Sequence, residues 1–201
     1  MGNVLCLDLS TNSTGYAVFD RKSKKLLKHG LIKPETKGLH KLHYPEAVLA
    51  KMKSIASQVR DLIVELVPEI VVCEEVNRGI SRIGQKGLDA AHFFVLDYVM
   101  MVRPDLVKTW QYIDSNGKKG WRGMLGLKLS DTDKEINATI RNKNRKKKAS
   151  EKAPVIDWKM LAQRVINVKY KKTFDVWERS SDSDEVDAIA LGDAWLNFVD
   201  K

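Results

Sequence analysis

The sequence predicts an α/β fold, in which a five-stranded mixed sheet carries helices on both faces. Short apolar runs typical of strands fill the first part of the chain, and segments with a helical period of apolar residues follow from residue 45. The predicted order is three strands, a helix, a strand, a helix, a strand and then further helices. This order is typical of a mixed sheet layered between helices.

The strands are predicted from short apolar runs bounded by turn residues. Residues 4–9 (VLCLDL) contain a single acid, Asp8, and are typical of a buried central strand. Turn residues at 11–15 separate this run from the next one at 16–19, so the two strands are expected to pair as a hairpin. The five predicted strands span residues 4–9, 16–19, 25–32, 69–75 and 106–113.

The helices are predicted from apolar residues that recur every three or four positions. In residues 45–66 this pattern places Leu49 and Met52 on one face. The last helix is expected to begin at Ser181, which can cap it, with Asp184 three residues later as the capping partner. The four predicted helices span residues 45–66, 88–101, 155–168 and 181–199.

Residues 1–201 are expected to form a single domain, because a chain of this length can bury one core. The regular patterns break down between residues 114 and 154, where a basic loop or insertion is predicted. Within it, residues 141–148 (RNKNRKKK) are expected to form a mobile loop or a frayed helix end. For the cations at 145–148, non-specific attraction to phosphates and plain solvation are equally good explanations.

The chain is strongly basic, with a net charge of +9 and a pI of about 9.4. A basic protein of this size favours polyanionic partners, either nucleic acid or an anionic membrane surface. The charges are segregated, since residues 117–152 contain 12 Lys/Arg and 4 Asp/Glu, whereas residues 175–201 contain 2 Lys/Arg and 8 Asp/Glu. A basic surface beside an acidic cluster suits a metal-dependent nuclease. The basic surface neutralises the phosphates of the nucleic acid, and the acidic cluster binds metal cations.

The apolar segments and the cysteines indicate in which cellular compartment the protein is expected. No apolar run reaches the roughly 18 residues of a membrane-spanning helix, and the first residues lack the pattern of a signal peptide. Cys6 and Cys73 lie inside apolar runs and are expected to be buried thiols in a reducing compartment. We therefore expect a cytoplasmic protein with no membrane partner and no small-molecule cofactor.

Five acidic residues stand out. Asp8 lies in a predicted buried strand, where a carboxylate must be paired, protonated or bound to metal. By itself, a hydrogen bond to a backbone turn explains Asp8 equally well. Glu74 and Glu75 end the fourth predicted strand and point to opposite faces, so only one of them can reach a given site. Asp184 and Asp187 are three residues apart at the start of the last helix and therefore share one face.

Each of these signals is weak alone, because acids also mark strand ends and the first turns of helices. If the strand carboxylates and the helix pair converge at one edge of the sheet, they form a site for Mg²⁺ or Mn²⁺, which prefer carboxylate oxygens. Two such ions about 4 Å apart can activate a water molecule and stabilise the leaving oxygen in phosphodiester hydrolysis. The acids therefore predict a metal-dependent phosphodiesterase site.

Three segments together resemble the RuvC family of Holliday junction resolvases, and most of all its phage-encoded members. Residues 5–18 (LCLDLSTNSTGYAV) match the family's opening strand and hairpin. Residues 71–76 (VVCEEV) match its strand with a catalytic glutamate, and residues 183–190 (SDEVDAIA) match its closing helix. Order and spacing agree over nearly the whole chain apart from residues 117–154.

The resemblance implies which acids are catalytic. It selects Glu74 over Glu75, and it implies that Asp8, Glu74, Asp184 and Asp187 hold the metal ions, Mg²⁺ with Mn²⁺ as a substitute. It also implies a ribonuclease H-like fold and an endodeoxyribonuclease that cleaves Holliday junctions and other branched DNA. A homodimer with paired, symmetric incisions across a four-way junction is the assembly it implies.

Further residues are assigned to the dimer and to DNA. The predicted helix at 88–101 is apolar on more than one side, which suits a dimer seam, although burial within the monomer explains it nearly as well. The family's DNA-contacting lysines correspond to Lys108 and Lys119. Lys118 and Arg122 are proposed as DNA-binding residues from charge alone. The five tryptophans are expected in the core or at an interface.

One position departs from the family pattern. Cellular members carry an aromatic residue shortly after the glutamate, where this sequence has Asn77. We therefore do not expect a strong preference for particular DNA sequences at the cleavage site. We expect broad cleavage of forks, flaps and junctions. Three alternatives stay open, namely a ribonuclease H-like nuclease for RNA–DNA hybrids, a non-catalytic junction-binding protein, and a sugar-kinase or actin-like ATPase, for which the chain is short.

Overall fold

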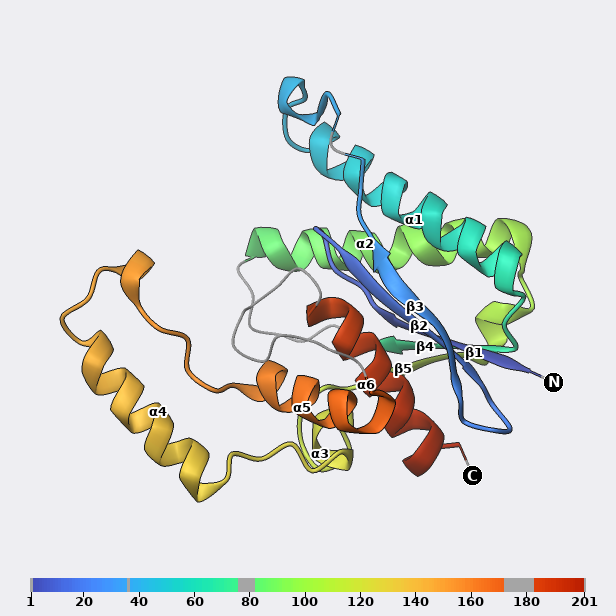
Figure 1. The fold of residues 1–201 in the computed structure, drawn as a ribbon. Helices are drawn as coiled ribbons and strands as arrows, with labels where there is room; N and C mark the ends of the chain where they lie inside the picture. The colour runs from blue at the N-terminus through green and yellow to red at the C-terminus, as the bar shows by residue number, and fades with distance from the viewer. Residues whose placement is uncertain (1, 36, 76–81, 172–182, 201) are drawn as a thin grey trace.

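The computed structural model describes residues 2–35, 37–75, 82–171 and 183–200, with the backbone alone at 82 and 83. At its centre is a five-stranded sheet built from β1 (Asn3–Asp8), β2 (Thr14–Asp20), β3 (Leu26–Ile32), β4 (Ile70–Glu74) and β5 (Trp110–Ile113) (Figure 1). The strand order is β3-β2-β1-β4-β5. β1–β2 and β2–β3 are antiparallel, whereas β1–β4 and β4–β5 are parallel, so the predicted mixed sheet is confirmed.

Helices cover both faces of this sheet. The long helices that pack on it are α1 (Glu46–Leu66), α2 (Arg82–Val102), α5 (Trp158–Tyr170) and α6 (Ser183–Phe198). α1 and α2 form one layer, and α5 and α6 form the other (Figure 1). Because side chains alternate along a strand, Leu5 and Leu7 of β1 are buried in the α1–α2 layer, whereas Val4 and Cys6 are buried in the α6 layer.

The parallel strands bring distant segments to one edge of the sheet. β1 ends at Asp8 and its parallel neighbour β4 ends at Glu74, so both side chains lie at the same edge. α6 begins there as well, in very close contact with β2. A Cβ atom on Gly15 would lie 1.8 Å from the backbone oxygen of Asp184. A glycine at position 15 is therefore required for the first turn of α6 to lie against the strand ends.

The predicted fifth strand is half as long as expected. Leu106–Thr109 form a 3-10 helix, η2, and only the residues of β5 pair with β4. The hydroxyl of Thr109 donates to the backbone oxygens of Glu69 (2.8 Å) and Leu106 (3.1 Å). The side chain of Thr109 thus contacts the backbone just before β4, and the β4–β5 ladder starts at Trp110.

The helices depart from the sequence prediction most clearly at two places, and α5 begins three residues later than predicted. α2 begins at Arg82, six residues before the predicted start. α4 (Asp131–Asn144) is a helix within the region predicted as a basic loop or insertion. Its cap is a reciprocal pair, because Ser130 Oγ accepts from the Asp133 N–H at 3.0 Å and the Asp133 carboxylate accepts from the Ser130 N–H at 3.1 Å. The helical period was not recognisable because the buried positions of α4 are polar, Asp133 and Asn137.

The remaining elements are short. They are η1 (Leu39–Lys41), α3 (Trp121–Met124) and η3 (Ala149–Glu151). α4 and η3 stand away from the sheet and its helices, joined to them by extended segments (Figure 1). None of the helices in the described ranges is both long and apolar enough to cross a bilayer. Cys6 and Cys73 are buried free thiols, and the predicted cap Ser181 and Asn77 lie outside the described residues.

Candidate active site

A cavity of about 330 Å³ opens at the edge of the sheet where β1 and β4 end. All four predicted catalytic acids line it. Asp8 comes from β1, Glu74 from β4, and Asp184 and Asp187 from the first turns of α6. The structure therefore brings together carboxylates from three segments that are far apart in the sequence.

Three of these acids form a tight group. Asp8, Asp184 and Asp187 each offer one carboxylate oxygen, and these oxygens lie within 4.8 Å of one another. Asp187 is only 2% exposed, and its Oδ1 has no hydrogen-bond partner within the part of the chain that is described. An unpaired buried carboxylate oxygen beside two further carboxylates is the environment that a hard divalent cation fits. The residues present thus suit a metal ion by their own chemistry.

Two acids of this group, Asp8 and Asp187, have raised pKa values without a metal ion. Burial raises the pKa of Asp8 well above its usual range, and the charges of Asp187, Glu74 and Asp184 raise it further. Burial also raises the pKa of Asp187 to about 7, against the opposing effect of Lys159. A cation that replaces these protons would relieve the repulsion between the carboxylates.

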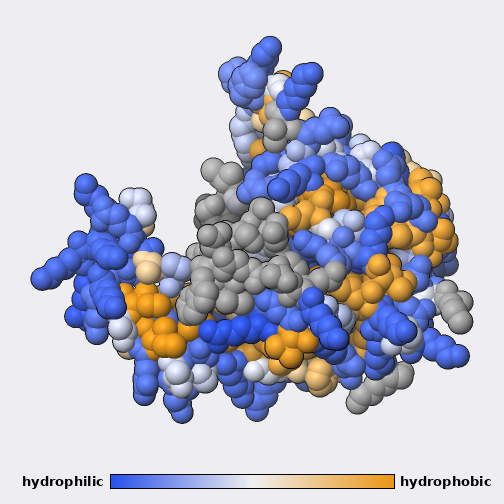
Figure 2. All heavy atoms as spheres, viewed as in Figure 1, coloured by the Kyte–Doolittle hydropathy of each residue, from blue (hydrophilic) through white to orange (hydrophobic). Residues whose placement is uncertain are grey.

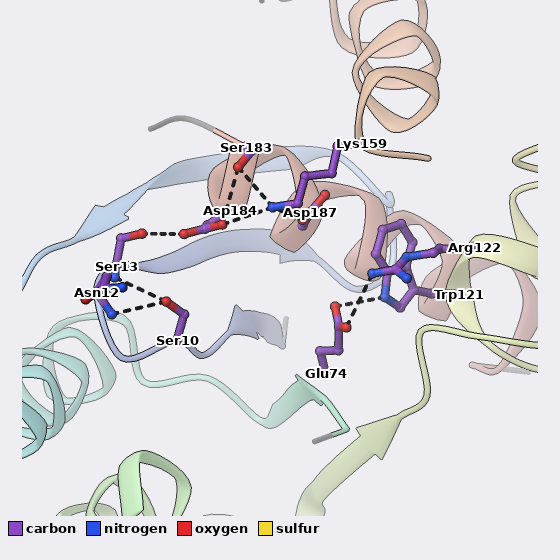
Figure 3. Close-up of polar contacts among 10 residues, drawn as sticks. All are labelled: Ser10, Asn12, Ser13, Glu74, Trp121, Arg122, Lys159, Ser183, Asp184 and Asp187. Carbon is purple, nitrogen blue, oxygen red and sulfur yellow. Dashed lines mark hydrogen bonds and ion pairs between the residues drawn. The ribbon is translucent and has the colours of Figure 1, made fainter. Parts of the chain in front are cut away.

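Glu74 faces the group from the other side of the cavity, where two neighbouring residues hold it (Figure 3). The indole Nε1 of Trp121 donates to Glu74 Oε2 at 3.1 Å, and the guanidinium of Arg122 lies 3.7 Å from Glu74 Oε1. Burial raises the pKa of Glu74, and Arg122 and Trp121 partly offset that rise. Glu75 is exposed at the rim of the cavity, so the choice of Glu74 agrees with its deeper position.

The turn between β1 and β2 positions Asp184. Ser10 Oγ accepts hydrogen bonds from the backbone N–H groups of Asn12 (3.2 Å) and Ser13 (3.3 Å), which fixes the turn. The hydroxyl of Ser13 then donates to the carboxylate of Asp184 (Figure 3). This hairpin therefore contributes Asp8 at its start and, at its turn, a hydroxyl that orients Asp184.

Lys159, which was not among the residues predicted from the sequence, enters the cavity from α5. Its Nζ lies 3.5 Å from Asp184 Oδ1 and 3.5 Å from Asp187 Oδ2, and 3.1 Å from Ser183 Oγ (Figure 3). Burial alone would lower the pKa of Lys159, but the carboxylates outweigh it and the pKa is raised. Lys159 lies in the first turn of α5, where a lysine opposes the helix dipole, but this mismatch was hidden because the helix was predicted to begin three residues earlier.

Arg122 was predicted to bind DNA, and the structure places it inside the cavity wall. Its guanidinium carbon lies 3.2 Å from the centre of the Trp158 ring and 5.1 Å from that of Trp121. Stacked in this way and facing Glu74, the side chain is largely buried. Two of the tryptophans expected in the core thus form part of the site.

The predicted DNA-binding lysines are exposed at different edges. Lys118 and Lys119 lie in the turn that follows β5, at the same edge as the acidic group. Lys108 lies in η2, before β5 begins, next to the start of β4. The sheet therefore separates Lys108 from the acids by the length of β5.

Comparison with known proteins relates this architecture to solved structures. No family model and no curated protein sequence matches the chain. Thermus thermophilus RuvC in complex with a Holliday junction substrate is similar at 13% identity and a TM-score of 0.52, covering 96% of this chain and 92% of that one. A second Thermus thermophilus RuvC structure gives 14% identity and a TM-score of 0.53 with the same coverage.

A eukaryotic structure is similar over the same span. The yeast mitochondrial Holliday junction resolvase Ydc2 is 10% identical, with a TM-score of 0.50, covering 96% of this chain and 78% of that one. At these identities the similarity concerns the fold. The five-stranded mixed sheet between helices is therefore the ribonuclease H-like fold of RuvC.

Proposed function

We propose that this protein is a divalent-metal-dependent endonuclease that cleaves Holliday junctions and other branched DNA. The observation that carries the proposal is the group of Asp8, Asp184 and Asp187, whose carboxylate oxygens lie within 4.8 Å of one another with a buried, unpaired oxygen on Asp187. It lies at the open edge of a fold that the chain shares with solved Holliday junction resolvases. The net charge of +9 supports a nucleic-acid substrate.

In this proposal the four acids hold two divalent cations, Mg²⁺ in the cell with Mn²⁺ as a substitute. Asp8, Asp184 and Asp187 form one side of the site and Glu74 the other. When bound, the cations supply an activated water and charge stabilisation for the leaving oxygen of the phosphodiester. The protein's part is to hold the carboxylates in place, with Ser13 orienting Asp184 and Trp121 orienting Glu74.

Lys159 has two proposed roles. Without metal its ammonium group neutralises Asp184 and Asp187, which keeps mutually repelling carboxylates together. With DNA bound, the ammonium group of Lys159 attracts the phosphate, which would otherwise be repelled by the carboxylates of the site. Lys118 and Lys119, exposed at this edge, extend the attraction to the flanking backbone.

We further propose a homodimer, since two incisions across a four-way junction need two sites. The described part of α2 exposes three large apolar side chains, with Asp97 between them. Phe93 is 72% exposed and Met100, seven residues later and therefore on the same face, is 55% exposed, with Met101 beside it at 69%. This face supports α2 as the dimer seam.

The experiment that tests the proposed function compares substrates and metals. A labelled four-way junction, a fork, a linear duplex and an RNA–DNA hybrid are incubated with the protein in Mg²⁺, Mn²⁺ or EDTA. We expect cleavage of the junction and the fork that requires metal and is abolished in Asp8→Asn, while Glu75→Gln, a matched carboxylate at the rim, retains it. Preference for the hybrid, or junction binding without cleavage, would reject the proposal in favour of one of its alternatives.

A further inference from the structure

The chain carries a basic projection that the proposed site does not use. α4, η3 and the extended residues 152–157 form an arm that stands off the sheet and its helices (Figure 1). Figure 2 shows hydrophilic side chains over the far part of this arm and a hydrophobic patch nearer the rest of the molecule. We call its far end the basic tip, which comprises Arg141, Lys143, Arg145, Lys146, Lys147, Lys148 and Lys152.

The basic tip is strongly charged, and its cations are exposed to solvent without ion-pair partners in the described residues. All seven cations are exposed, and Glu151 is the single acid between residues 141 and 152. None of the seven forms an ion pair with another residue in the described ranges. Cations near the end of a helix suit its dipole, but that accounts for Arg141 and Lys143 alone. The other five repel one another, and Arg145 also repels Arg141 four residues earlier.

Two asparagines hold the arm in a defined shape. Asn137 Nδ2 donates to the Ile156 oxygen at 2.8 Å, and Asn137 Oδ1 accepts from the Ile156 N–H at 2.7 Å. Two helical turns later, Asn144 makes the same pair of bonds with Ala153, at 2.7 and 3.0 Å. The returning segment is thus pinned along α4 at two points, so the intervening cations are presented on a fixed loop.

The base of the arm is attached to the helix that carries Lys159. Arg164 of α5 donates to Asp133 of α4 at 2.8 Å. A small apolar cluster of Ile156, Met160 and Leu161 lies where the returning segment enters α5. The arm and the cavity are therefore connected through one helix, and the basic tip keeps a set position relative to the acids.

We propose that the basic tip binds the phosphate backbone of a duplex arm of the branched DNA, outside the site of incision. This proposal rests on the proposed function, since it assumes that the acids act on branched DNA. α4 has 14 residues, so it is about 21 Å long. That length corresponds to about six base pairs, since a strand carries one phosphate per 3.4 Å or so. The exposed, unpaired cations of the basic tip can therefore contact several phosphates of a DNA duplex, in which the negative charges repeat regularly along the helix axis.

A salt titration tests this with matched variants. The triple variant Lys146→Gln, Lys147→Gln and Lys148→Gln removes three charges from the basic tip. The control variant Lys22→Gln, Lys24→Gln and Lys25→Gln removes three exposed charges from the β2–β3 hairpin, at the opposite edge of the sheet. Affinity for a labelled four-way junction is measured over a range of NaCl concentrations in EDTA. A hydroxyl-radical footprint of each complex is recorded as well.

We expect the tip variant to reduce the slope of log Kobs against log[NaCl] by up to about 2.7, because each phosphate contact contributes about 0.9. Its footprint should lose protection on one duplex arm away from the branch. The control variant should keep the wild-type slope and footprint. An unchanged slope and footprint in the tip variant would overturn the inference and favour an acidic protein partner. The proposed function fails separately, if the wild-type protein binds and protects the junction but does not cut it with metal.

Discussion

The indole N–H of Trp121 donates a hydrogen bond of 3.1 Å to Oε2 of Glu74, so a fully buried ring orients a carboxylate at the wall of the cavity. Arg122, the next residue, lies 3.7 Å from the other oxygen of the same carboxylate. A single turn of helix, α3, thus positions Glu74 from both sides. This arrangement makes Trp121 a positioning residue in the proposed nuclease.

The first prediction concerns this hydrogen bond. Trp121→Phe keeps an aromatic ring in the core but removes the N–H donor, so Glu74 loses one of the contacts that orient it. We expect the single-turnover rate of junction cleavage to fall about 10- to 100-fold, since small displacements of catalytic groups are costly. The affinity for the junction should change little, and the two quantities are measured separately.

Trp195→Phe is the matched control. Trp195 is also buried, and its Nε1 donates to Gln111 Oε1 at 2.8 Å, away from the cavity. The same chemical change should therefore lower stability to a similar degree and leave the cleavage rate intact. An equal loss of rate in both variants would mean that Trp121 acts through stability alone.

The second prediction concerns the repulsion among the acids. Asp8→Asn removes a carboxyl that, in the folded protein, must either bind a proton or stay charged beside three neighbouring carboxylates, as its raised pKa reflects. In EDTA the variant should melt above the wild type, by about 2–4 °C for each kcal/mol of repulsion removed. In Mg²⁺ the wild type should gain stability, and the variant should lose most of that gain, because a ligand that binds the folded state alone stabilises it.

Glu135→Gln, at an exposed position of α4 away from both the cavity and the proposed dimer seam, serves as the control for the melting experiment. It should melt like the wild type in EDTA and in Mg²⁺. An Asp8→Asn protein that keeps the full response to Mg²⁺ would show that the cation binds elsewhere.

The third prediction concerns pH. The pKa of Asp187 is about 7 in the folded protein against 3.8 as its ordinary value, so between these values the folded state binds more protons than the unfolded state. Stability in EDTA should therefore fall as pH rises from about 4 to 7, because the folded state must give up protons that it binds more tightly than the unfolded state does. The raised pKa values of Asp8 and Glu74 act in the same direction.

Urea denaturation at several pH values in this range measures the effect. Asp187→Asn cannot lose the proton, so its stability should fall less over the same range. Divalent cations compete with the same protons, so the affinity for Mg²⁺ should rise with pH. Equal pH dependence in the wild type and in Asp187→Asn would contradict the assignment.

The fourth prediction concerns the arm. Asn137→Ala leaves the buried N–H and C=O groups of Ile156 without partners, at a cost of about 1–3 kcal/mol for each group. The amide of Ile156 should therefore exchange with solvent much faster, as measured by hydrogen exchange. Asn142→Ala, an exposed position of the same helix, should leave that exchange unchanged. Equal protection of Ile156 in both variants would show that Asn137 does not hold the arm.

Much of the fold was predictable because the residues of its core recur with the period of a strand or a helix within single segments. β1 alternates between two apolar layers, and α1 carries one apolar face, so each was recognisable without its partners. α4 was missed for the opposite reason, since it is held by polar groups that depend on a distant segment. The bonds from Asn137 to Ile156 leave no periodic apolar signal.

The same distinction applies to the site. Asp8 was conspicuous because it is a charge in an apolar strand, and Asp187 followed from its spacing to Asp184. Lys159 and Trp121 were not assigned to the site, because their roles depend on how α5 and α3 pack against the sheet edge. Packing of this kind has no signature in the residues that flank them.

The most direct test of the metal centre is the anomalous scattering of Mn²⁺ in crystals of the protein soaked with that ion. We expect a peak in contact with the carboxylates of Asp8, Asp184 and Asp187, and its loss in crystals of Asp187→Asn. The absence of a peak at these three carboxylates, or an equal peak in crystals of Asp187→Asn, would contradict the proposal that Asp8, Asp184 and Asp187 hold the metal ion.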